Sequence, residues 1–245
     1  MGAQWKQAGR EQNANKKGII IGKLAKEISV AAKLGDPNPE NNPRLRMAVE
    51  AARKHSVTRD TIERAIKKGA GLLDEQVNYE LVTYEGFCPH QVPVIVECLT
   101  ENRNRTAAEI RVLFRKGQLG SSGSVAWMFD RLGVIEASTA EGGLDIEGVA
   151  IEAGAQNVEP IAGDELKQMN PDHKTGARFI CEPQDLDSVS KAVTALGWKV
   201  VSAELSYLAK NNVEISDEQK KEVTAFLNDI DDFDDVHRVY VGLKS

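Results

Sequence analysis

The first quarter of the chain carries apolar residues at helical spacing. From Ile20 onward they recur every three to four positions, and the pattern ends at Gly35. The same period returns over 44–55. A third stretch follows a capping Ser56 or Thr58 and ends at a glycine. The spacing therefore predicts three short amphipathic helices.

The periodicity then changes to the alternation typical of strands. Strands are predicted over 79–84 and 92–99, followed by a helix over 106–116 that Asn104 or Thr106 would cap. Two further segments, 124–129 and 134–137, have the pattern of a hairpin pair. This part of the chain is therefore predicted to form a sheet with local hairpins.

A second set of strands and helices follows. The predicted segments are a helix at 144–153, a strand near Val158, a strand at 177–180, a helix at 184–196 and a strand at 199–205. A final helix at 217–229 and strand at 236–241 have no neighbouring strands of their own, so we expect them to complete the first sheet. This order predicts an α+β protein with two ferredoxin-like domains behind a small helical domain.

These boundaries divide the chain into four parts. We predict a flexible basic arm over 1–18, a three-helix basic domain over 19–76, a discontinuous α+β domain from 77–133 plus 207–245, and a second α+β domain over 134–206.

Charge divides the chain more sharply than composition does. Residues 1–71 hold fifteen Lys/Arg against seven Asp/Glu, a formal charge of +8, whereas the remaining 174 residues hold sixteen against thirty, or −14. A net charge of −6 therefore conceals a strongly basic module joined to an acidic body. Such asymmetry indicates that one end of the protein meets a polyanion, with nucleic acid as the first candidate.

The basic module supplies most of the candidate binding residues. They are Trp5, Lys6, Arg10, Lys16, Lys17, Lys23, Lys26, Arg44, Arg46, Arg53, Lys54, Arg59, Arg64, Lys67 and Lys68. Their Lys and Arg side chains suit phosphate contacts, and Trp5 could stack on a base or instead anchor the arm to the folded body. Any single lysine is more simply interpreted as ordinary solvated surface, whereas the cluster as a whole favours contact with nucleic acid.

A second candidate is the turn Asn102, Arg103, Asn104 and Arg105, where a predicted strand gives way to a helix. Backbone N–H groups at a helix start, together with two guanidinium groups, form a plausible phosphate site. The glycine-rich segment 117–124 lacks the Lys-Ser/Thr ending of a P-loop and precedes a strand, so we interpret it as a flexible hairpin entry. The acidic run 229–235 is interpreted as a solvated turn.

No pattern in the chain indicates catalysis, a metal or a cofactor. The four histidines are scattered, and the nucleophile, zinc and dinucleotide motifs are absent. Three widely spaced cysteines form no disulfide framework, and neither a signal peptide nor a membrane span is recognisable. We therefore expect a cytoplasmic, non-enzymatic protein without a membrane or small-molecule partner.

Several longer motifs resemble those of the YebC/PmpR family. They include the segments 44–46, 62–69, 84–87, 94–100, 102–106, 123–126, 129–135 and 234–236. The resemblance implies a helical N-terminal domain followed by two α+β domains, the middle one closed by the C-terminal helix and strand. It also implies a probable DNA-binding transcriptional regulator. Some similar proteins instead look like ribosome-associated translation factors that relieve stalling at proline runs.

Three functions therefore remain open. The first is a non-enzymatic, DNA-binding transcriptional regulator. The second is a translation factor that uses the same basic module on ribosomal RNA. The third is a protein-interaction scaffold whose acidic body binds basic partners, in which case deletion of the basic module would leave binding intact.

Overall fold

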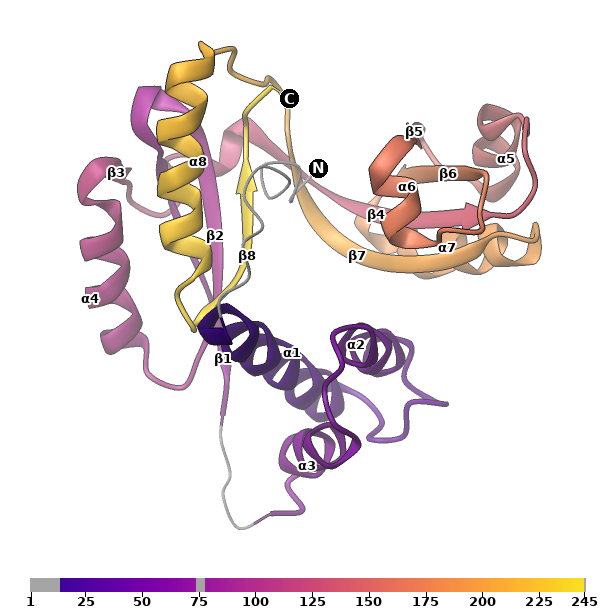
Figure 1. Cartoon of the computed structure of the whole chain (residues 1–245), viewed down its shortest axis with the longest axis horizontal. Helices are drawn as coiled ribbons and strands as arrows, with labels where there is room; N and C mark the ends of the chain where they lie inside the picture. The colour runs from indigo at the N-terminus through magenta and orange to yellow at the C-terminus, as the bar shows by residue number, and fades with distance from the viewer. Residues whose placement is uncertain (1–13, 74–77, 245) are drawn as a thin grey trace. The chain divides into compact units, whose positions relative to one another are not determined.

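The computed structural model describes residues 14–73 and 78–244, except for the side chains of 14–17, 43 and 168. The chain separates into two compact units (Figure 1). The first contains the residues up to Phe129 and from Ala209 onward, and the second spans Asp130–Leu208. The limits of the three predicted domains stay a prediction.

Three helices open the first unit. They are α1 (Ala14–Leu34), α2 (Pro43–Lys54) and α3 (Arg59–Gly69). Their apolar faces meet in one core that includes Ile28, Leu45 and Ile62. Thr58 caps α3. Helix α1 begins inside the segment 1–18 that was predicted as a flexible arm, because a helix built from good formers such as Ala and Lys continues beyond its packed stripe.

The first unit also contains a four-stranded antiparallel sheet in the order β3-β1-β2-β8. Its strands are β1 (Glu80–Phe87), β2 (Pro93–Thr100), β3 (Gln118–Leu119) and β8 (Val236–Val241). A 3-10 turn, η2 (Pro89–Gln91), joins β1 to β2, and η3 (Phe114–Lys116) follows the helix α4 (Arg103–Leu113).

Helices α4 and α8 (Asp217–Asp231) cover one face of this sheet. Ile110 and Phe114 from the α4 side and Phe226 and Ile230 from α8 pack against Val96 and its strand neighbours. The last helix and strand of the chain therefore lie beside strands that precede them by more than a hundred residues (Figure 1).

Two expectations for this region are wrong. The helix α4 starts three residues earlier than predicted, with Asn102 as its N-cap. The hairpin pair 124–129 and 134–137 does not form, because β4 (Phe129–Thr139) is one continuous strand that follows the 3-10 turn η4 (Ala126–Met128). The Glu85 carboxylate accepts hydrogen bonds from backbone N–H groups of the preceding loop, so these groups do not pair with a strand.

The second unit is built on the sheet β5-β6-β4-β7. Its further elements are α5 (Ile146–Ala153), β5 (Asn157–Ile161), α6 (Gly163–Met169), β6 (Thr175–Cys181), η5 (Pro183–Asp185), α7 (Leu186–Ala195) and β7 (Lys199–Ala209). This order is that of a ferredoxin-like sheet, with α6 as an unpredicted addition. Phe179 and Trp198 meet edge to face in its core, with ring centroids 5.4 Å apart. Two antiparallel sheets behind a helical region confirm the α+β class.

Candidate nucleic-acid interface

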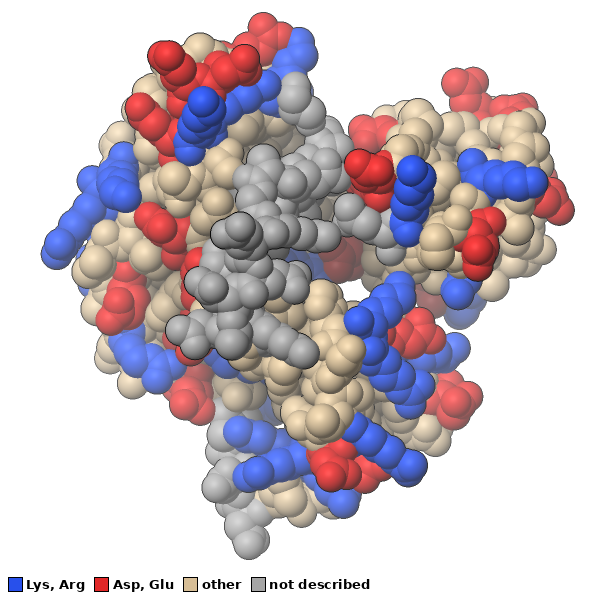
Figure 2. All heavy atoms as spheres, viewed as in Figure 1, with Lys and Arg blue, Asp and Glu red and all other residues tan. Residues whose placement is uncertain are grey.

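Exposed Lys and Arg side chains gather on the second and third helices. Arg53 and Lys54 occupy the last turn of α2, and Arg64 and Lys67 lie on the exposed side of α3. Within the part of the chain that the structure describes, these four side chains make no ion pair. Figure 2 shows Lys and Arg side chains concentrated over this helical region. We call these four residues the α2–α3 basic surface.

Three other basic residues of the helical region lie close to this surface but have partners. The Arg46 guanidinium donates to the carbonyl oxygens of Pro39 and Glu40, at 3.2 Å in each case. Arg59 forms an exposed ion pair with Glu63 one turn along α3, at 2.7 Å. The Lys68 ammonium lies 5.9 Å from the centroid of the Tyr79 ring. Among the residues that the structure describes, Arg46 and Lys68 thus have no carboxylate partner.

Two lysines of α1 are turned toward the end of α8 and the start of β8. Lys23 donates to the backbone oxygen of Asp231 and lies 3.4 Å from its carboxylate. Lys26 donates to the Asp234 carbonyl and to the Asp235 carboxylate, both at 2.8 Å. These predicted binding residues therefore connect the helical region to the sheet.

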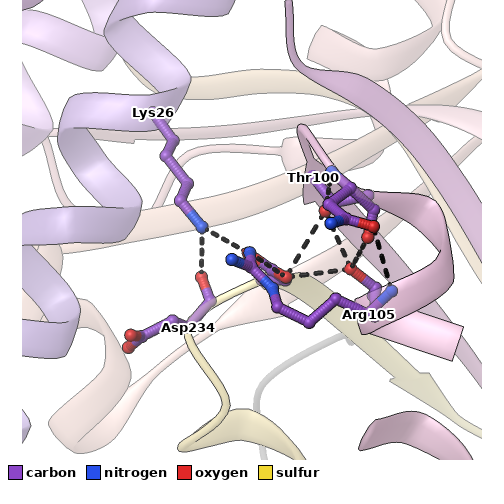
Figure 3. Close-up of polar contacts among 7 residues, drawn as sticks. Lys26, Thr100, Arg105 and Asp234 are labelled. Atoms are coloured by element: carbon purple, nitrogen blue, oxygen red, sulfur yellow. Dashed lines mark hydrogen bonds and ion pairs between the residues drawn. The ribbon is translucent and has the colours of Figure 1, made fainter. Parts of the chain in front are cut away.

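Asp235 is the centre of this connection. Figure 3 shows Lys26, Thr100 and Arg105 drawn together in this region. The Asp235 side chain is 3% exposed, and it accepts hydrogen bonds from Lys26, from Arg105 at 3.0 Å and from Thr106 at 2.9 Å. The hydroxyl oxygens of Thr106 and Thr100 lie 2.8 Å apart, so Thr106 can accept a hydrogen bond from Thr100 while it donates to Asp235. Burial by itself would raise the pKa of the Asp235 carboxyl, but the donors around it hold that pKa below its ordinary value. The Asp235 carboxylate is therefore ionised, and its oxygens accept hydrogen bonds from Lys26, Arg105 and Thr106.

The turn 102–105 is exposed, but three of its side chains make contacts within the fold. The Asn102 side chain accepts a hydrogen bond from the Arg105 backbone N–H at 3.1 Å and so caps α4. The Arg103 guanidinium lies 3.7 Å from the Glu80 carboxylate, and Asn104 is exposed. Both arginines of the predicted phosphate site thus have carboxylate partners. The interpretation of 229–235 as a solvated turn is wrong for Asp235, because a charge run gives no sign of which carboxylate is buried.

A second charge network joins α1, α2 and β8. Glu27 lies 2.9 Å from the Arg44 guanidinium and 3.2 Å from the His237 ring. Burial opposes ionisation of Glu27, yet the hydrogen bond and charge of Arg44 and the neighbouring His237 lower its pKa overall. Burial and the nearby Arg238 lower the pKa of His237 to about 4, so its imidazole is neutral near pH 7.

Part of the candidate set cannot be placed. Trp5, Lys6 and Arg10, and the side chains of Lys16 and Lys17, lie outside the described residues. Their role in binding stays a prediction.

The described residues contain no group of His, Cys, Asp and Glu arranged to hold a metal ion. The three cysteines are buried, and burial raises the pKa of Cys98 to about 12 and of Cys181 to about 11. In the range that the structure covers, every helix is too short or too polar to cross a membrane.

Comparisons with known proteins cover nearly the whole chain. Residues 2–72 match the TACO1/YebC protein N-terminal domain, and residues 79–243 match the TACO1/YebC second and third domain. A protein from Pseudomonas syringae pv. tomato is 55% identical over 99% of both chains, and one from Bdellovibrio bacteriovorus is 53% identical over 99% of this chain and 100% of its own. Both are named probable transcriptional regulatory proteins.

The fold has a counterpart among solved structures. The crystal structure of a conserved hypothetical protein from Aquifex aeolicus superposes with a TM-score of 0.78 at 36% identity, covering 97% of this chain and 94% of that one. The chain belongs to the TACO1/YebC family.

Proposed function

We propose that this protein is a non-enzymatic regulator that binds nucleic acid, in the first instance DNA, through the α2–α3 basic surface. The observation that carries the proposal is that Arg53, Lys54, Arg64 and Lys67 are exposed and have no carboxylate partner in the described residues. The name of the relatives, probable transcriptional regulatory protein, supports DNA as the target.

The size of the surface suits a duplex backbone. Helix α3 has eleven residues and is therefore about 16 Å long, a span over which duplex DNA carries about ten phosphates. Four phosphate contacts, two from α2 and two from α3, would make binding strongly salt-dependent. The expected loss between 50 and 200 mM salt is about 150-fold for four phosphates neutralised.

The third helix offers little for reading base edges. Its first turn exposes Asp60, and its Arg59 is paired with Glu63. Asn and Gln, the side chains that read adenine in the major groove, are absent from α3. We therefore propose that binding depends mainly on the phosphate backbone and shows low sequence specificity.

Charge reversal tests the proposal. The variant with Arg53→Glu, Arg64→Glu and Lys67→Glu is titrated with a labelled 20-base-pair duplex at 50 mM salt, and circular dichroism checks its fold. We expect binding to fall by at least 100-fold and the slope of log K against log salt to decrease by about 2.7, because three of the four phosphate contacts are lost. A matched control reverses three exposed cations of the second unit, Lys167, Lys191 and Lys199, and should bind as the parent does. Unchanged affinity of the folded first variant would refute the surface.

A second candidate function follows from the weak base readout. A surface that contacts phosphates without reading bases would serve equally well on ribosomal RNA, as in the translation-factor alternative. Sedimentation of the tagged protein from lysate separates the two. Co-migration with ribosomal particles that high salt reverses and DNase leaves unchanged would support RNA. DNase-sensitive fast-sedimenting material would support DNA.

A further inference from the structure

A large aromatic side chain stands exposed on the loop between β3 and β4. Trp127 is 68% exposed, whereas the other described tryptophan, Trp198, is 3% exposed in the core of the second unit. An exposed indole contributes less to folding stability than a buried one, because its large apolar surface stays in contact with water. The exposure of Trp127 is therefore better explained by contact with a binding partner than by a contribution to folding.

The loop that carries Trp127 is held in one conformation. The buried Glu85 carboxylate accepts hydrogen bonds from the backbone N–H groups of Gly123 at 2.6 Å, Val125 at 2.8 Å and Ala126 at 2.7 Å. The Gly120 N–H donates to the Glu85 carbonyl oxygen at 2.8 Å. The segment interpreted as a flexible hairpin entry is thus fastened to β1 at four points.

Its glycines serve this close packing. A Cβ at Gly117 would collide with the Phe87 carbonyl oxygen, and one at Gly120 would collide with the Ser124 hydroxyl. Gly117 and Gly120 are therefore explained by close contacts with β1 and within the loop itself.

The indole itself is oriented by the same loop. Its Nε1–H donates to the Ser124 carbonyl oxygen at 3.0 Å. The polar edge of the ring is therefore satisfied within the protein, and an apolar ring surface is presented to solvent. A fixed aromatic surface binds with little loss of side-chain entropy, which is the requirement for stacking.

The charge of the surrounding segment selects the partner. Residues 103–128 hold five Lys/Arg against the single Glu109. Three of these cations, Arg103, Arg105 and Lys116, pair with carboxylates outside the segment. Arg111 and Arg115 are exposed and have no carboxylate partner in the described residues. The loop 117–128 itself contains no charged side chain. An aromatic surface within a basic segment fits a nucleic acid whose bases are accessible.

We propose that Trp127 stacks on an unpaired base of a nucleic acid. This inference rests on the proposed function, because it assumes that the protein binds nucleic acid, and it adds a second contact that duplex DNA alone would not use. Phosphates would engage the α2–α3 basic surface, while an unstacked base would meet the indole.

The test uses the full-length chain with two probes, a twelve-nucleotide oligouridylate and a hairpin duplex with the same number of phosphates. Trp127→Ala should weaken oligouridylate binding by about 5- to 150-fold, the range for losing one stacked base, and should leave duplex binding unchanged. Trp127→Phe should retain part of the affinity. Ile151→Ala, which removes another highly exposed apolar side chain, should have no effect.

A direct readout accompanies the affinities. In a Trp5→Phe background, oligouridylate should quench the emission of the exposed Trp127, while the buried Trp198 gives a constant signal. Trp127→Leu separates stacking from general apolar contact and should bind like Trp127→Ala.

The outcomes distinguish the two proposals. Equal oligouridylate affinity of Trp127→Ala and the parent, or parental affinity of Trp127→Leu, would overturn stacking while intact duplex binding preserves the proposed function. If the parent bound neither probe, the proposed function itself would fail.

Discussion

Replacement of Asp235 by Asn tests how the helical region is held to the sheet. The substitution keeps the size of the side chain and one acceptor oxygen but removes the charge. It also places an amide N–H₂ group among donors, namely the Lys26 ammonium, the Arg105 guanidinium and the Thr106 hydroxyl. At least one of these donors then loses its partner in a buried site.

The expected loss of stability can be estimated contact by contact. The hydrogen bond with the largely buried Lys26 is charge-assisted and contributes about 2 kcal/mol. Arg105 is half exposed, so solvent screening reduces its share to less than about 1 kcal/mol. The Thr106 hydroxyl adds about 1 kcal/mol. The sum predicts that Asp235→Asn destabilises the first unit by about 3 kcal/mol.

Urea unfolding followed by far-UV circular dichroism measures this change. With a slope of about 2 kcal/mol per molar urea, the midpoint of the first unit should fall by about 1.5 M. Backbone amides of α1 should also exchange faster with solvent, since the Lys26 contact is lost.

Asp229→Asn is the matched control. Asp229 belongs to the same acidic run but forms only an exposed pair with Lys116 at 3.4 Å, so its replacement should cost less than about 0.5 kcal/mol. If Asp235→Asn had as small an effect as the control, the buried carboxylate would not be the connection described here.

Two further substitutions test the loop and the second charge network. Glu85→Gln should destabilise the first unit by about 2 kcal/mol, because one N–H donor of the loop loses its acceptor. The fluorescence anisotropy of Trp127 should also fall. The control Glu80→Gln, on the exposed part of the same strand, should change neither the stability nor the anisotropy. His237 has a pKa of about 4 in the folded state and about 6.5 in the unfolded state. Between these values the unfolded chain binds a proton that the folded chain does not. The free energy of unfolding should therefore fall by about 2 kcal/mol from pH 7 to pH 5. His237→Gln should remove that part of the pH dependence, and an unchanged slope in urea titrations at the two pH values would contradict the burial of a neutral imidazole.

Local patterns in the sequence were sufficient for most secondary structure. The helical spacing of 44–55 and 217–229 and the apolar segment 236–241 correspond to α2, α8 and β8 because each buries one continuous face, and such a face is visible in the order of residues. The loop that replaces the first strand of the hairpin predicted at 124–137 was not predictable in this way. Its amides bond to Glu85, about forty residues earlier, and no local pattern records that partner.

The sequence by itself determined the α+β class and the concentration of positive charge in the first 71 residues, since both depend on residue order and count. Only the tertiary structure decided which cations remain available. Lys26 and Asp235 are 209 residues apart in the chain, yet the pairing of β8 with β2 brings them within 2.8 Å. Arg64 has no such partner among the described residues. Whether a charged side chain has an ion-pair partner depends on which residues folding brings beside it. Partners that are far apart in the chain cannot be recognised from the local order of residues.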